Sequence, residues 1–304
     1  MKLRLLGLFA PLALTACTHA PPTPNSTRAP QSTLETFYQT EHLFLPVAQG
    51  KMLEGPSADR DGRVFVANVG KRGTIGHFQA GDLAPRVWLT LPDGGASAST
   101  RMGPDGRLWI ADYRKHRMYS VAPGGNELRL EFEANELNQP NDFTFAEDGT
   151  IYLSDPSWSS KKKGRIYKWD RTKGLQLVAE DLKAVNGIDL LPGEKTLVYS
   201  ESISGRLMKI ELPDGTPETL YKFKPDTVDG LRVDNQGNIY VARIQQGAID
   251  VISAQGELVQ SIRLQGKEPT NLNFGGPDGR TMYVTLRDLD AIEIFRVPSP
   301  ARGN

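Results

Sequence analysis

The chain repeats a tight turn followed by a strand-like run at a nearly constant interval. The turns Asp61-Gly62, Asp105-Gly106, Asp148-Gly149, Gln236-Gly237 and Asp278-Gly279 each precede such a run, and Gly193-Glu194 fills the remaining interval. The period is about 42 to 46 residues, which falls in the range of β-propeller blades. Each such unit is too small to bury both of its faces alone, so the repeat predicts a fold in which similar units pack on one another.

Each unit contains enough strand-like segments for four strands. Apolar residues alternate with polar ones, or form short β-branched runs, between Gly, Pro, Asp and Asn, which is the pattern of β-strands. Six such units predict an all-β, six-bladed β-propeller. The last unit has no residues left for an outer strand, so we expect the N-terminal run 42–48 (HLFLPVA) to complete the last blade. The alternative, a large β-sandwich, does not predict an even period.

The composition limits the classes of partner. The 304 residues contain 36 Lys and Arg against 36 Asp and Glu. Balanced charge without a basic stripe argues against a nucleic-acid partner. About 260 residues after the N-terminal region suit one propeller better than two domains.

The N-terminal region has the layout of a bacterial export signal. Lys2 and Arg4 precede a short apolar run, and Leu14-Thr15-Ala16-Cys17 follows it. The run is too short for a transmembrane helix, and the last four residues resemble a lipobox. We therefore expect residues 1–16 to be a lipoprotein signal peptide and Cys17, the only cysteine of the chain, to be lipidated.

The residues after Cys17 are rich in Pro, Ser and Thr, a composition typical of an extended tether. The predicted organisation is a signal peptide at 1–16, a lipidated Cys17 with its tether at 17–35, and the propeller at 36–300. The mature protein is expected to be exported and anchored to a bacterial membrane, on the periplasmic face of the outer membrane if the source is Gram-negative.

Polar residues recur at one position of the repeat. The residues eight positions before each turn, counted from the glycine or from Glu194, are Glu54, Asn141, Asn186, Asp229 and Asn271, and only Ala98 breaks the series. Equal positions in a repeat fold are equivalent in space, so we expect these side chains to converge on the propeller axis.

Three of these side chains have the chemistry of a metal site. Glu54, Asn186 and Asp229 offer two carboxylates and an amide carbonyl, which suit a hard divalent cation. Calcium is the expected ion, with magnesium, manganese or zinc as alternatives. A cation would also remove the repulsion between two carboxylates that face each other. The alternative is that these groups cap the innermost strands and bind water in the channel.

Several motifs resemble the family of gluconolactonase, senescence marker protein and luciferin-regenerating enzyme. They are Leu53-Glu54-Gly55-Pro56, Gln139-Pro140-Asn141-Asp142, Val185-Asn186-Gly187, Val228-Asp229-Gly230 and the stretch Thr270–Gly279. The resemblance runs from about residue 42 to residue 297. It implies a six-bladed propeller that holds one divalent metal through Glu54, Asn186 and Asp229, and it implies that Asn141 holds substrate. We also assign Asn271 to substrate binding.

The resemblance implies hydrolysis of a lactone, and two departures concern its identity. Gln139 stands where some sugar-lactonase relatives have an arginine that contacts polyol hydroxyls, and Ala98 leaves the second blade without a polar side chain at the axis. Both departures argue against a gluconolactone-like substrate.

Two hypotheses for function follow. The first is a metal-dependent lactone or ester hydrolase in which Asp229, or a second carboxylate such as Asp226, is the base for a metal-activated water. The second is a non-catalytic, membrane-tethered propeller that binds a small ligand or an envelope protein, because propellers support many functions.

Overall fold

The computed structural model describes residues 37–43, 52–68, 71–79, 82, 85–158, 163–225 and 227–303. By its internal contacts the chain divides into Met1–Glu35 and Thr36–Asn304. The first part, with the predicted signal peptide, Cys17 and the whole predicted tether, lies outside the described residues, as does Asp226.

The described chain is almost entirely β-structure. Its one helical segment is the 3-10 turn η1 (Pro92–Gly94), and no helix in the described ranges has the length and apolarity to span a bilayer. The strands are β1 (Thr40–Leu43), β2 (Glu54–Ala58), β3 (Val64–Ala67), β4 (Thr74–Phe78), β5 (Arg86–Thr90), β6 (Ser97–Met102), β7 (Leu108–Asp112), β8 (Arg117–Val121), β9 (Arg129–Glu133), β10 (Phe143–Phe145), β11 (Ile151–Asp155), β12 (Gly164–Asp170), β13 (Gly174–Leu182), β14 (Val185–Leu190), β15 (Thr196–Glu201), β16 (Arg206–Glu211), β17 (Glu218–Lys222), β18 (Leu231–Val233), β19 (Ile239–Arg243), β20 (Ala248–Ile252), β21 (Leu258–Arg263), β22 (Pro269–Gly275), β23 (Thr281–Leu286) and β24 (Ala291–Arg296).

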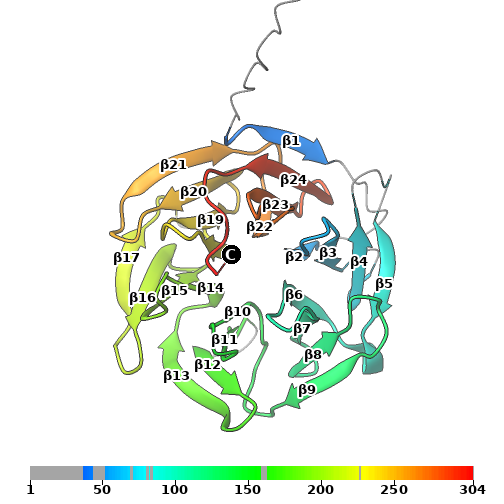
Figure 1. The fold of residues 1–304 in the computed structure, drawn as a ribbon. Helices are drawn as coiled ribbons and strands as arrows, with labels where there is room; N and C mark the ends of the chain where they lie inside the picture. The colour runs from blue at the N-terminus through cyan, green and yellow to red at the C-terminus, as the bar shows by residue number, and fades with distance from the viewer. Residues whose placement is uncertain are drawn as a thin grey trace, which may run out of the picture. The chain divides into compact units, whose positions relative to one another are not determined.

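The strands form six four-stranded antiparallel sheets arranged as the blades of a ring (Figure 1). This confirms the predicted six-bladed β-propeller. The last blade has the order β1-β24-β23-β22, so an N-terminal strand completes it, as predicted. The pairing runs from Thr40 opposite Phe295 to Leu43 opposite Ile292. The strand begins two residues before the predicted segment, and residues 44–48 of that segment lie outside the described residues.

The hydrophobic core is divided among the junctions between neighbouring blades. At the junction of the first and last blades, for example, Leu53 and Val64 pack with Tyr283 and Ile292. Equivalent clusters lie at the other five junctions. Because each cluster takes side chains from two blades, a blade buries its faces only when both neighbours are present.

The innermost strands carry irregularities at the end where they begin. The pairing register shifts between Glu54 and Ser57, and between Val185 and Ile188. An extra residue in one strand bends it and redirects a side chain. Glu54 and Asn186 lie at these irregularities, so the backbone can turn their side chains toward the axis of the ring.

The same strand ends pass very close to the next blade. A Cβ atom on Gly187 would lie 2.3 Å from the backbone nitrogen of Leu231, and one on Gly230 would lie 2.3 Å from Oδ1 of Asn271. Such distances exclude any side chain. Glycine directly after Asn186 and Asp229 therefore lets neighbouring inner strands approach closely enough to bring the two side chains together.

Replacing Gly187 by alanine should destabilise the propeller, because the new methyl group meets backbone that cannot move without its blade. We expect a loss of about 1–3 kcal/mol, the usual cost of overpacking. The measurement is the melting temperature of Gly187→Ala compared with that of the control variant Gly124→Ala. At Gly124 the nearest atom to a new Cβ is 3.2 Å away, on the side chain of Asn126, so that variant should change stability by less than about 0.5 kcal/mol. Equal melting temperatures for the two variants would contradict the close approach.

Candidate functional site

Three of the predicted side chains meet where the inner strands begin. Glu54 is the first residue of β2, Asn186 is the second of β14, and Asp229 lies two residues before β18. Asn186 and Asp229 are buried. Nδ2 of Asn186 donates hydrogen bonds to Oδ1 of Asp229 and to Oγ of Ser202, the latter at 3.3 Å. The structure thus joins side chains from two different blades directly.

The two carboxyl groups of the site are held in an unfavourable environment for charge. Burial raises the pKa of Asp229 to about 8, the charge of Asp142 adds to the rise, and the positive charge of Arg287 opposes it. Burial also raises the pKa of Glu54 well above its ordinary value, and the next largest cause is the charge of Asp229. Among the described residues, no cation forms an ion pair with either carboxylate that would stabilise its charge at neutral pH.

The nearest cation on the chain does not neutralise the pair. Arg287 lies at the end of β23, and its Nε donates a 2.9 Å hydrogen bond to Oε2 of Glu268. That bond is the largest cause of its raised pKa, and the charges of Asp229 and Glu54 contribute less. Arg287 acts on the two carboxylates at longer range while its own ion pair is with Glu268.

The donor set fits a divalent cation. Glu54 and Asp229 supply carboxylate oxygens that raise each other's energy when both are ionised, and rotation of the Asn186 amide would present its carbonyl oxygen to the same place. The described residues contain no cluster of three or more His, Cys, Asp and Glu side chains that could hold a metal. Two carboxylates with one amide are therefore the metal-binding chemistry that the channel offers.

Asn141 lies in the third blade at the same end of the channel. Its backbone N–H donates to the carbonyl of Ser154 at 2.9 Å, and its own carbonyl accepts from Oγ of Ser99 at 2.5 Å. The segment before it is clamped by the buried carboxylate of Asp155, which accepts from the N–H groups of Asn138 and Gln139. These backbone contacts fix the position from which the Asn141 side chain extends.

Asn271 lies one residue beyond the position that it was expected to share. Its Oδ1 accepts from the N–H of Leu272 at 2.8 Å, just as Oδ1 of Asp142 accepts from Phe143 at 2.9 Å. Asn271 thus matches Asp142, and Thr270 stands where the other blades place Asn141 and Asp229. Asn271 is 1% exposed, so its amide oxygen is already used inside the last blade, and its role in substrate binding stays a prediction.

A second layer of polar side chains lines the channel below these residues. It is formed by one residue from each inner strand, three positions past the upper layer: Ser57, Arg101, Thr144, Asp189, Arg232 and Asn273. This layer was not predicted from the sequence, although in five blades its members lie five residues before the same turn position. The periodicity that located Glu54 and Asp229 was a sufficient signal.

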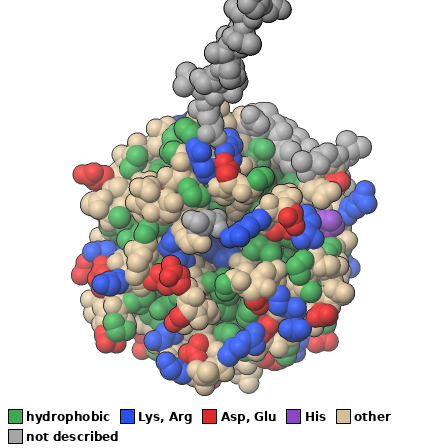
Figure 2. All heavy atoms as spheres, viewed as in Figure 1, with side chains coloured by type: hydrophobic (Ala, Val, Ile, Leu, Met, Phe, Trp, Pro, Cys, Tyr) green, Lys and Arg blue, Asp and Glu red, His purple; other side chains and the backbone are tan. Residues whose placement is uncertain are grey.

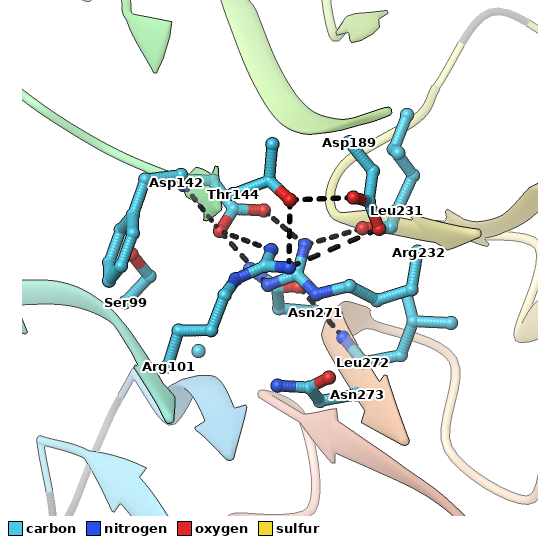
Figure 3. A network of polar contacts seen from close by, with 12 residues as sticks. Ser99, Arg101, Asp142, Thr144, Asp189, Leu231, Arg232, Asn271, Leu272 and Asn273 are labelled. Carbon is cyan, nitrogen blue, oxygen red and sulfur yellow. Dashed lines mark hydrogen bonds and ion pairs between the residues drawn. The ribbon is translucent and has the colours of Figure 1, made fainter. Parts of the chain in front are cut away.

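The second layer carries its own neutralising charges. Arg232, 1% exposed, donates to both carboxylate oxygens of Asp142 at 2.7 and 3.0 Å. Figure 3 shows the guanidinium of Arg101 beside that of Arg232, between Asp142 and Asp189. Burial, followed by the charge of Arg232, lowers the pKa of Arg101 to about 10. Removing one member of such a buried pair typically costs about 3–5 kcal/mol.

The C-terminal segment closes the other end of the channel. Ala301 forms a bridge with Asp234, and the N–H of Arg302 donates to the carbonyl of Val233 at 3.1 Å. The guanidinium of Arg302 then reaches Glu194 and the carbonyl of Phe145. Figure 1 shows the chain ending over the centre of the ring. The upper layer lies at the other end of the channel, which we call the open end because the C-terminal segment does not reach it.

The raised pKa of Asp229 makes stability depend on pH and on cations. A carboxyl whose pKa rises from 3.8 when unfolded to about 8 when folded keeps its proton longer in the folded state, so the free energy of unfolding falls as pH rises between these values. At pH 8.5 a saturating divalent cation should restore stability, by about 2.7 kcal/mol at a hundredfold excess over Kd, and at pH 5 it should have little effect.

Thermal unfolding at both pH values, with and without calcium, magnesium or manganese, measures this. Asp229→Asn should lose most of the pH dependence, whereas Asp214→Asn, exposed on the opposite face, should behave as the unchanged protein. A cation effect that is equal at pH 5 and pH 8.5 would contradict the assignment.

Comparisons with known proteins place the chain in a family. Residues 95–287 match the model of the SMP-30/Gluconolactonase/LRE-like region. A gluconolactonase of Zymomonas mobilis is 24% identical over 216 residues, which cover 62% of this chain and 60% of that protein. The lactonase drp35 of Staphylococcus saprophyticus is 27% identical over 235 residues, 72% of each chain. The human adipocyte plasma membrane-associated protein is 26% identical over 204 residues, 60% of this chain but 48% of that protein.

Solved structures show the same fold. Regucalcin of Agrobacterium tumefaciens, described as a calcium-binding protein, superposes with a TM-score of 0.72 at 20% identity, covering 84% of this chain and 93% of that one. A gluconolactonase of Xanthomonas campestris gives a TM-score of 0.70 at 19% identity, covering 82% and 87%. Because the family model matches most of the chain, from the second blade to the last, the protein belongs to the SMP-30/gluconolactonase/LRE-like family.

Proposed function

We propose that this protein is a divalent-metal-dependent hydrolase that opens a lactone, or a related ester, at the open end of the channel. The observation that carries the proposal is the unneutralised pair Glu54 and Asp229 beside Asn186, in a family whose relatives include named gluconolactonases and lactonases. The chain spans only about half to three-fifths of several curated relatives that it matches, so their activities suggest the reaction class rather than the substrate.

Each residue of the site has a role in this reaction. A bound divalent cation would polarise the lactone carbonyl and lower the pKa of a water molecule. Asp229 would accept the proton of the attacking water, since a carboxylate in this environment is a stronger base than one in solvent. The proton then passes to the ring oxygen as the carbon–oxygen bond breaks. Asn141 would orient the ring and donate a hydrogen bond to the carbonyl oxygen as its negative charge develops.

The hydrogen bonds of Gln139 are relevant to the number of hydroxyl groups that the substrate carries. Its Oε1 accepts from the N–H of Trp158 at 2.8 Å, and its backbone N–H is held by Asp155 at 2.6 Å. A side chain whose amide oxygen orders a neighbouring loop has less capacity to bind several hydroxyl groups than a free arginine has. We therefore favour a lactone or ester with few hydroxyl groups over a sugar lactone.

Asp229→Asn tests the proposed chemistry. The amide keeps the shape of the side chain but cannot accept a proton, so turnover should fall by at least a hundredfold, the lower range for a general base, with the fold unchanged. The assay uses a panel of acyl lactones, sugar lactones and aryl esters, with and without EDTA, and Asp214→Asn is the matched control. Activity retained by Asp229→Asn would exclude this residue as the base. A metal-binding protein without activity on any member of the panel would favour the alternative, a non-catalytic ligand-binding propeller.

We further propose that the mature protein is exported and anchored through a lipid on Cys17. The support is the sequence pattern alone, since these residues lie outside the described ones. Expression in a bacterial host with a labelled fatty acid should label the protein and place it in the membrane fraction. Cys17→Ser should carry no label. Equal labelling of the two proteins would contradict the anchor.

A further inference from the structure

The large apolar side chains that reach the surface of the propeller fall into two groups. One group lies on the outermost strands of the blades and consists of Val87, Leu130, Leu177, Leu258 and Val259. The other lies in loops at the open end of the channel: Met52, Trp158, Ile203 and Leu289, which are 37%, 45%, 73% and 39% exposed. Among the described residues, the loops of the opposite face contain no exposed large apolar side chain. Among the described loop residues, the exposed large apolar side chains therefore all lie at the end of the channel where Glu54, Asn186 and Asp229 lie.

Each of these four loop residues is next to an element that positions the site. Met52 lies two residues before Glu54, and Leu289 lies in the β23–β24 turn beside Arg287. Ile203 lies in the β15–β16 turn beside Ser202, the hydrogen-bond partner of Asn186. Trp158 is tied to Gln139 through its backbone N–H. Two pairs, one from the first and last blades and one from the third and fourth, thus flank the channel mouth.

The charged side chains of this face are mainly basic. Its loops expose Lys71, Arg72, Arg114, Lys183, Lys224 and Lys267. The acidic side chains exposed in the loops of this face are fewer: Asp93, Glu136 and Asp288. Asp181, at the end of β13, is also exposed and pairs with Lys163. In the turns of the opposite face the balance is reversed, because exposed acidic residues outnumber the basic ones. Figure 2 shows this face, on which acidic and basic side chains are intermingled. The open end of the channel therefore combines apolar side chains with positive charge.

We propose that this face docks on an anionic lipid bilayer, with Trp158, Ile203, Leu289 and Met52 in the interface and the lysines at the headgroups. The cores of protein–protein interfaces are contiguous and depleted in lysine, whereas here single apolar side chains alternate with lysines around an opening. Isolated apolar side chains that enter the headgroup region, with basic ones binding anionic lipid, are the features of interfacial membrane binding. Docking in this way would turn the channel mouth toward the lipid.

The proposal depends on the surface and not on hydrolysis, so it can hold for a binding protein as well.

The test uses the full chain carrying Cys17→Ser, which removes the predicted lipid. Vesicles are made from a phosphatidylcholine with brominated acyl chains, with or without phosphatidylglycerol, and quenching of tryptophan fluorescence is measured. Trp109 and Trp169 are buried in the core, and the fourth tryptophan, Trp88, is half-buried on the outermost strand β5, away from the loops of this face, so quenching by bromine in the bilayer should come mainly from Trp158.

We expect quenching several-fold stronger with phosphatidylglycerol than without it. Trp158→Phe should abolish most of it, and the double variant Lys183→Glu, Lys224→Glu should reduce it at least fivefold. The matched control Val87→Glu, Leu130→Glu, on the outermost strands, should leave it unchanged. Absence of quenching, quenching that survives Trp158→Phe, or equal effects of the two double variants would overturn the proposal. Self-association of the chain without lipid quenching would assign the surface to a protein partner instead.

Discussion

The closure of the ring is the constraint on which the rest of this structure depends. No blade has a core of its own, because each hydrophobic cluster is shared between two neighbours. The pairing of Thr40–Leu43 with β24 joins the two ends of the chain in one sheet. Once the ring is closed, the six inner strands surround one axis. The size of the residues where these strands begin then sets the distance between neighbouring strands. Gly187 and Gly230 make that distance short, and the site follows from it.

The period of the sequence was enough to predict the blades and their closure, because turns and strand alternation are local properties. It also located Glu54, Asn186 and Asp229, whose side chains the structure brings together. The period misplaced Asn271 by one position. In the last blade the turn begins at Gly276, three residues after the channel-lining Asn273. In the fifth blade the equivalent turn begins at Asp234, only two residues after Arg232. An insertion within a strand moves the register without changing the turn motif, so counting from the turn cannot detect it.

The two layers of the channel treat their acidic groups differently. In the lower layer, Asp142 and Asp189 are neutralised by arginines of the chain itself, and the pKa of Asp189 is lowered by Arg302, Arg101 and Arg232 despite the opposing effect of burial, which is the largest single influence. In the upper layer, the cation that acts on Glu54 and Asp229 among the described residues is the more distant Arg287. Three arginines thus contact the lower carboxylates, whereas no described arginine lies between Glu54 and Asp229. A positive charge for the upper pair would have to come from a bound ion. That asymmetry is the strongest physical argument for a cation at the mouth.

The two ends of the channel also differ, because the C-terminal segment fills one of them. At the lower end, Arg302 and the bridge between Ala301 and Asp234 fill the axis, so a ligand can approach Asp229 only from the upper end. The loops at the upper end carry the exposed apolar side chains Met52, Trp158, Ile203 and Leu289. A channel open on one face, with acidic groups inside it and apolar and basic groups around it, selects for ligands that approach from a low-polarity phase or carry apolar parts. If the proposed function holds, the loop side chains around the mouth, rather than the propeller fold itself, determine which ligand reaches Asp229.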